Sequence, residues 1–67
     1  MADGSEGIDG LALKFLRLQA GVRQAAVARY MGTSRQRVTA LERRGARPTP
    51  EAERRYLQAL NLAVGDL

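Results

Sequence analysis

The chain has 67 residues, carries a formal charge of +4 and contains neither cysteine nor histidine. This length allows one small domain, which buries only about 60% of the surface that its unfolded chain exposes, so the core must be simple. The missing cysteine and histidine exclude disulfides and thiolate metal sites and remove the commonest general base, so we expect no enzyme and no metal or cofactor.

No segment of the sequence is suited to a membrane. The longest apolar runs, such as residues 25–28, fall far short of the roughly 20 residues that span a bilayer. The N-terminus shows no signal-peptide pattern. We therefore expect a cytoplasmic protein with no membrane partner.

The charge is distributed unevenly along the chain. Residues 10–60 contain Lys14 and all ten arginines against three glutamates, a balance of +8, whereas the other four acidic residues lie in the end segments. The planar guanidinium of arginine makes bidentate contacts with phosphate and guanine, so this composition favours a nucleic-acid partner. A solvated basic surface in a genome rich in G and C would explain the composition equally well.

The N-terminal part predicts an arm followed by a helix. Residues 1–9 are small, acidic and rich in glycine, which is typical of a flexible arm. A helix is expected at about residues 11–20, with Asp9 as its N-cap and Gly21 after its end. The residues expected to face the core are Leu13, Leu16 and Ala20.

Two short helices joined by a tight turn are predicted in residues 24–45. The first covers residues 24–31 and stops at Gly32, where glycine allows a left-handed turn. Thr33 and Ser34 can cap the second helix, which is expected to run to about Arg43. Its inward residues are Val38 and Leu41, and its outward residues are Arg35, Gln36, Thr39, Ala40 and Arg43. Any pair of antiparallel helices could share this spacing, so the pattern alone says little about function.

The C-terminal part predicts a loop, a helix and a short tail. Residues 45–48 form the loop, and Thr49 followed by Pro50 is a good start signal for a helix to about Leu60. The residues expected to face inward are Ala52, Tyr56, Ala59 and Leu60. Residues 61–67 form a short C-terminal segment, which is a candidate stub of a fifth helix or the beginning of a longer chain.

Several residues match a known family position by position. They are Gln24, Val27, Ala28, Gly32, Ser34, Val38, Leu41, Glu42 and Pro48. This pattern resembles the lambda-repressor/Cro-like helix-turn-helix family, also called the XRE family, over roughly residues 13–60. The resemblance implies an all-α fold of four to five short helices in which residues 10–60 form a helix-turn-helix DNA-binding domain. The implied function is sequence-specific binding of double-stranded DNA, as a transcriptional regulator.

The resemblance also implies which residues contact DNA. The second helix of the helix-turn-helix would enter the major groove, where arginine suits the two acceptors of guanine and glutamine suits adenine. Thr39 offers either a methyl group for thymine or a hydroxyl. The implied base-reading residues are Arg35, Gln36, Thr39 and Ala40. The expected phosphate contacts are Arg23, Gln24, Arg37, Arg43, Arg44 and Arg47. The alternative is that these side chains form only a solvated face.

One structural ion pair is implied as well. By resemblance, Arg17 packs beneath the second helix and pairs with Glu42, which would fix the angle between helices. The alternative is an ordinary surface charge at Arg17. Three residues depart from the family pattern: Arg23 stands where a capping residue is usual, Arg44 where glycine is common, and Glu53 where leucine is usual. The end of the second helix and the geometry of the loop are therefore left open.

The expected partner is double-stranded DNA. A monomer of this size would bind weakly, so a homodimer on a palindromic site is expected. No small-molecule ligand is expected for this chain. The alternative is a protein-interaction module, an antitoxin or adaptor, in which the same fold presents its arginines to an acidic partner protein.

Overall fold

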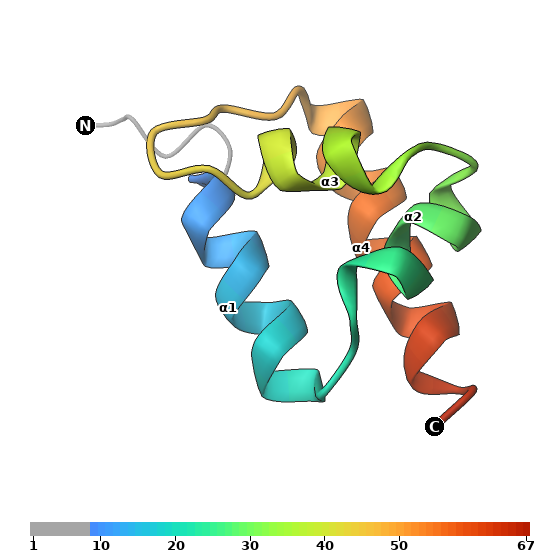
Figure 1. Ribbon diagram of the computed structural model, residues 1–67. Coiled ribbons are helices and arrows are strands. Elements are labelled where there is room, and N and C mark those ends of the chain that lie inside the picture. The colour runs from blue at the N-terminus through green and yellow to red at the C-terminus, as the bar shows by residue number, and fades with distance from the viewer. Residues whose placement is uncertain (1–8) are drawn as a thin grey trace.

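The computed structural model describes residues 9–67, so the expected arm, apart from Asp9, lies outside the described residues. Within that range the chain forms four helices (Figure 1). They are α1 (Gly10–Ala20), α2 (Gln24–Met31), α3 (Arg35–Leu41) and α4 (Pro50–Val64). Residues 9–67 contain no strand, so the predicted all-α class is confirmed. None of these helices combines the length and the apolar character needed to cross a membrane.

The helices enclose one small core. Helix α4 packs mainly against α2 and also touches α1, and α3 packs on α2. In Figure 1, α1 lies at the left, α2 and α4 lie at the right, and α3 lies near the top. The largest fully buried side chains are Leu13, Val27, Val38 and Tyr56. These residues come from α1, α2, α3 and α4, so every helix contributes to the same core.

Local capping determines where the helices begin. Asp9, Ser34 and Thr49 each accept a hydrogen bond from a backbone N–H two or three residues later, at the starts of α1, α3 and α4. Such a cap stabilises a helix by about 1 kcal/mol. Arg23 holds the same position before α2, but its side chain makes no capping hydrogen bond. Helix α2 therefore begins without the help that the other three receive.

The helix-turn-helix has the predicted boundaries at its turn. Helix α2 ends at Met31, and Gly32 follows with φ 72°, in the left-handed region where glycine avoids the strain of a Cβ. Helix α3, however, ends at Leu41 and not at about Arg43. Glu42 occupies the C-cap position with φ −91° and ψ 5°, and only 3% of it is exposed. The Glu42 side chain is turned into the interior at this point, where it meets a charged partner.

The inward face of α1 differs from the prediction. Leu13 is fully buried as expected, but Leu16 is 41% exposed, and Arg17 takes the buried position one residue later. Leu13 and Arg17 are four residues apart and lie on one side of the helix. Phe15 and Leu18 are exposed as well, so α1 carries apolar side chains on its solvent side.

Helix α4 is longer than predicted. It runs to Val64, so residues 61–64 continue α4 and do not start a separate fifth helix. Ala63 is 2% exposed and repeats the inward spacing of Tyr56, Ala59 and Leu60. Tyr30 on α2 donates a hydrogen bond to the Asp66 carboxylate beyond the end of α4. The C-terminal segment is thus part of the packed domain.

Candidate nucleic-acid interface

Helix α3 presents one exposed polar face. Val38 is fully buried and Leu41 is half-buried, which fixes the inward side of the helix. At about 100° per residue, residues 35, 36, 39 and 40 fall within one arc of the helix, away from Leu41 and on the side opposite Arg37. The exposed residues on that side are Arg35, Gln36, Thr39 and Ala40. All four residues that were predicted to read bases therefore share one accessible surface.

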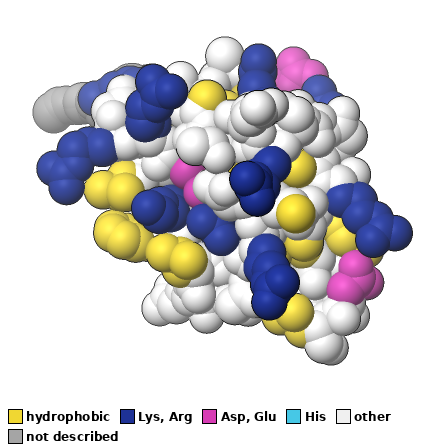
Figure 2. Space-filling view, in the orientation of Figure 1, with side chains coloured by type: hydrophobic (Ala, Val, Ile, Leu, Met, Phe, Trp, Pro, Cys, Tyr) yellow, Lys and Arg dark blue, Asp and Glu magenta, His cyan; other side chains and the backbone are white. Residues whose placement is uncertain are grey.

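The surroundings of this face are strongly cationic. Figure 2 shows Lys and Arg side chains spread across one side of the molecule, with few acidic side chains among them. The nine exposed arginines of the described residues outnumber the exposed acidic residues Asp9, Glu51 and Asp66. Such a surface attracts a polyanion and repels other cationic proteins.

A hollow of about 390 Å³ lies at the start of α2. It is lined by Arg17, Arg23, Gln24, Ala25 and Arg35. The first backbone N–H groups of a helix carry partial positive charge and have no acceptor within the helix. No side chain caps them here, and two exposed guanidinium groups, those of Arg23 and Arg35, lie beside them. The charge and the free donors of this hollow suit an anion such as a phosphate.

A buried ion pair lies beneath the exposed face. Arg17 Nε donates to Glu42 Oε2 at 2.7 Å, and Arg17 Nη2 donates to Glu42 Oε1 at 3.0 Å. Arg17 Nη1 also donates to the carbonyl oxygen of Val22 at 2.8 Å. The structure thus contains the pair that the resemblance implies. It joins α1 directly to the residue that ends α3.

The Glu42 carboxylate is the centre of a wider network. Besides Arg17, it accepts hydrogen bonds from the Tyr56 hydroxyl and from Gln24 Nε2, the latter at 3.0 Å. Burial disfavours the charged carboxylate, but the hydrogen bonds from Arg17, Tyr56 and Gln24 outweigh it and lower the pKa of Glu42. Burial and the hydrogen bond to Glu42 raise the pKa of Tyr56. At neutral pH the network therefore holds an ionised Glu42 and a neutral Tyr56.

Gln24 connects this network to the exposed face. Its Nε2 donates to Glu42, and its Oε1 accepts from the Thr39 hydroxyl at 3.2 Å. The same Thr39 hydroxyl lies 3.1 Å from the carbonyl oxygen of Arg35, one turn earlier in α3. Gln24, predicted as a phosphate contact, is thus also a link between the buried pair and α3.

The N-terminal end of α1 is attached to the loop that follows α3. The Asp9 carboxylate accepts hydrogen bonds from the N–H groups of Leu11 at 2.9 Å and Gly45 at 3.1 Å. These two hydrogen bonds lower the pKa of Asp9. The Gly10 N–H donates to the carbonyl oxygen of Ala46 at 2.9 Å. We call the hydrogen bonds to Gly45 and Ala46 the Asp9–Gly10 contact.

The Asp9–Gly10 contact depends on two glycines. A Cβ on Gly10 would lie 2.1 Å from the carbonyl oxygen of Leu41 and 2.7 Å from that of Arg43. Gly45 has φ 83°, which residues with a Cβ rarely adopt. This arrangement holds the loop just beyond α3, with its cationic side chains in solvent. They are Arg43, Arg44 and Arg47.

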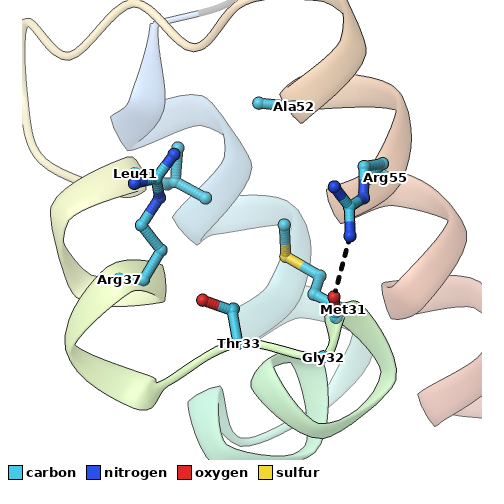
Figure 3. A pocket seen from close by; sticks show the side chains of 7 residues that line it. All are labelled: Met31, Gly32, Thr33, Arg37, Leu41, Ala52 and Arg55. Carbon is cyan, nitrogen blue, oxygen red and sulfur yellow. Dashed lines mark hydrogen bonds between the residues drawn. The ribbon is translucent and has the colours of Figure 1, made fainter.

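Arg37 lies on another side of α3. It lines a hollow of about 220 Å³ together with Met31, Gly32, Thr33, Leu41, Ala52 and Arg55. Figure 3 shows Arg37 and Arg55 on opposite sides of this hollow, with Met31 and Thr33 between them. Arg55 Nη2 donates to the carbonyl oxygen of Met31 at 3.1 Å, which satisfies the C-terminal end of α2. Arg37 is therefore separated from the four residues on the outward face of α3.

No metal site is formed by the described part of the chain, since no three acidic side chains of residues 9–67 gather closely enough to hold an ion. Comparison with protein-family models matches residues 13–67 to the helix-turn-helix family. Searches of curated proteins and of solved structures gave no match. The family match covers the α2–turn–α3 unit, the Arg17–Glu42 pair and all of α4.

Proposed function

The chain belongs to the lambda-repressor-like helix-turn-helix family of DNA-binding domains, and on that premise we propose that it regulates transcription by placing α3 in the major groove of double-stranded DNA. The observation that carries this proposal is the outward face of α3. Its four exposed side chains, Arg35, Gln36, Thr39 and Ala40, are backed by a buried ion pair that holds the helix at a fixed angle. A helix held in this way can enter a groove without rearrangement.

Phosphate contacts at both ends of α3 would supply most of the affinity. At one end, Arg23 and Gln24 lie at the uncapped start of α2, where backbone N–H groups are free to donate. At the other end, the exposed arginines 43, 44 and 47 follow α3 in the loop held by the Asp9–Gly10 contact. Arg37, on another side of α3, adds a further cation. Neutralising several phosphates makes binding steeply dependent on salt.

Base contacts from α3 would supply the sequence preference. Arg35 has a planar guanidinium that matches the O6 and N7 acceptors of guanine. The Gln36 amide can donate and accept at N6 and N7 of adenine. Both are exposed in the first turn of α3, the part of such a helix that meets base edges.

We further propose that the domain binds as a homodimer on a palindromic site. One copy presents a single short helix, Arg35–Leu41, which can reach only a few base pairs. Two copies related by a two-fold axis would read two half-sites about one helical turn apart. Binding of two copies per duplex, with half-sites at that spacing, is the expected result in a stoichiometric titration monitored by analytical ultracentrifugation.

A titration of labelled random-sequence duplex at roughly 50 and 200 mM salt tests the function. We expect weak binding at the lower salt and a loss of about a hundredfold or more at the higher salt, the behaviour of several phosphate contacts. Selection from random DNA should then yield a preferred site. On that site Arg35→Ala should weaken binding by about 1–3 kcal/mol and relax one base position.

Arg54→Ala is the matched control, because Arg54 is exposed on α4 and lies outside the proposed interface. It removes the same charge and should leave the base preference unchanged. Absence of DNA binding even at the lower salt, by a chain whose circular dichroism shows it folded, would contradict the proposal. Capture of an acidic protein partner under those conditions would then favour an interaction module.

A further inference from the structure

The hydroxyl group of Thr39 is already engaged within the protein. Thr39 is exposed in the second turn of α3, and its Oγ1 lies 3.2 Å from Gln24 Oε1 and 3.1 Å from the carbonyl oxygen of Arg35. Both neighbours are acceptors without a proton. The single hydroxyl proton must therefore be donated to one of them, so it is not available to a base.

The orientation of the Gln24 amide supports this assignment. Its Nε2 lies 3.0 Å from Glu42 Oε1, an oxygen of a carboxylate whose pKa is lowered by its hydrogen bonds. An ionised carboxylate can only accept, so Gln24 must turn its NH₂ group toward Glu42. Its carbonyl oxygen is then the atom that faces Thr39. The buried ion pair thereby determines which way the Thr39 hydroxyl points.

With the hydroxyl engaged by Gln24 and the Arg35 carbonyl, the methyl group is the branch of the exposed Thr39 side chain that has no such partner. Ala40 follows directly and is also exposed, so the second turn of α3 presents methyl groups and no free donor at these two positions. Thymine is the base that presents a methyl group in the major groove. We propose that Thr39 discriminates bases through its methyl group, by apolar contact with the 5-methyl of a thymine. This inference rests on the proposed DNA-binding function and specifies one part of it.

The contact would be modest in strength. Burying one methyl-sized group is equivalent to a change of about fourfold in affinity for each copy bound. Thr39 would therefore refine a preference that Arg35 and Gln36 establish, and it would not determine the site alone.

Removing single thymine methyls from DNA tests the inference. The duplex selected by the wild-type chain would be resynthesised with 2′-deoxyuridine in place of each thymine in turn, which removes only the methyl group. We expect one thymine per half-site whose replacement weakens wild-type binding about fourfold. Thr39→Val keeps a methyl and removes the hydroxyl, so it should retain that loss. Thr39→Ser keeps the hydroxyl and removes the methyl, so it should bind both duplexes equally.

Each other outcome contradicts the inference in a distinct way. Loss of the uracil effect in Thr39→Val, which keeps a methyl group at this position, would show that the methyl of Thr39 does not make the contact. A uracil effect that survives in Thr39→Ser would assign the methyl contact to another residue, such as Ala40. Wild-type binding that is insensitive at every thymine would rule out methyl reading. Failure of the wild type to bind any duplex would instead refute the proposed function. Thermal unfolding of each variant confirms that it is folded.

Discussion

Arg17 and Arg35 carry the same side chain but lie in opposite environments. Arg17 is 6% exposed, and three of its nitrogens donate to Glu42 and to the carbonyl oxygen of Val22. Arg35 is exposed at the start of α3 and lines an open cationic hollow. The first is committed to the protein, and the second is available to a partner.

The difference shows how a very small domain divides its charges between structure and binding. A buried ion pair contributes little net stability because desolvation of both charges offsets their attraction, yet loss of one partner leaves an unpaired buried charge. The Arg17–Glu42 pair therefore fixes the position of α3 relative to α1. The exposed arginines can then vary without unfolding the domain, since surface substitutions usually change stability by about 0.5 kcal/mol or less.

The largest effect should come from breaking the buried pair. Glu42→Gln leaves the Arg17 guanidinium buried without a counter-charge, and we expect a loss of about 3–5 kcal/mol in the free energy of unfolding. That is a large share of the stability of a domain this small. Urea denaturation followed by circular dichroism would measure it. Glu51→Gln removes an exposed carboxylate on α4 and should change stability by about 0.5 kcal/mol or less. If Glu42→Gln and Glu51→Gln lowered the free energy of unfolding equally, burial of the Arg17–Glu42 pair would not matter to stability.

Lowering the pH should also destabilise the fold, because it protonates Glu42 in the Arg17–Glu42 pair. The pKa of Glu42 is lowered from its ordinary value of 4.5 in the folded chain, so the unfolded chain binds a proton first as pH falls. The stability that this carboxylate contributes is complete well above pH 4.5 and is lost as pH falls through its folded pKa. We expect urea midpoints that are flat from about pH 7 to pH 6 and fall steeply below about pH 5.

The pKa of Asp9 is also lowered, so it contributes to the same acid limb. Asp9→Asn removes that contribution and leaves Glu42 untouched. If the urea midpoint of Asp9→Asn still falls steeply below about pH 5, the fall is due to Glu42 in the buried network. A limb that disappears in this variant would show that the surface carboxylate, and not Glu42, dominates.

A third prediction concerns the Asp9–Gly10 contact, which joins α1 to the loop that carries exposed arginines. Gly10→Ala places a Cβ against two backbone oxygens of α3 and its following residues, so α1 and the loop must separate. We expect a loss of about 1–3 kcal/mol in stability, as for other overpacked sites. Chemical denaturation measures it. DNA affinity should also become less dependent on salt, because the loop arginines lose their fixed positions.

Gly65→Ala is the matched control for this glycine. Gly65 has φ −64°, which alanine adopts without strain, and a Cβ there would lie 3.2 Å from the Leu62 carbonyl oxygen, against 2.1 Å for the nearest oxygen at Gly10. Gly65→Ala should therefore change stability far less than Gly10→Ala. A neutral Gly10→Ala would mean that the Asp9–Gly10 contact does not constrain the loop.

The features that could be predicted from the sequence depend on neighbours along the chain. The boundaries of α2 follow from the apolar stripe of Val27, Ala28 and Met31 and from the glycine after it, and the structure confirms them. The caps Ser34 and Thr49 act on N–H groups three residues away, so a local pattern identifies them. The outward face of α3 follows from helical spacing alone.

The features that were missed depend on residues far apart. Periodicity counts apolar side chains, so it wrongly placed Leu16 inside. The buried Arg17 was predicted only through the family resemblance, because its partner Glu42 lies 25 positions away and leaves no local signal. Asp9 was recognised as a cap for α1, but its hydrogen bond to Gly45 spans 36 positions and has no local signal. The link from Gln24 to Thr39 likewise requires the folded arrangement of α2 and α3.

The smallest and most discriminating change is Arg23→Ser. Serine at this position can cap α2, as Ser34 caps α3, so stability should rise by about 1 kcal/mol. The same substitution removes a cation from the proposed phosphate site, so DNA affinity should fall and the salt dependence should weaken by about one counterion. Thermal unfolding and salt titration measure the two effects on one protein. Arg29→Ser, later in α2 at an exposed position outside the N-cap, removes the same charge without adding a cap. If Arg23→Ser stabilised the fold and left DNA binding unchanged, Arg23 would have no part in the interface. If Arg23→Ser raises stability and lowers DNA affinity, then Arg23 costs the free domain a helix cap and contributes instead a contact to a bound phosphate.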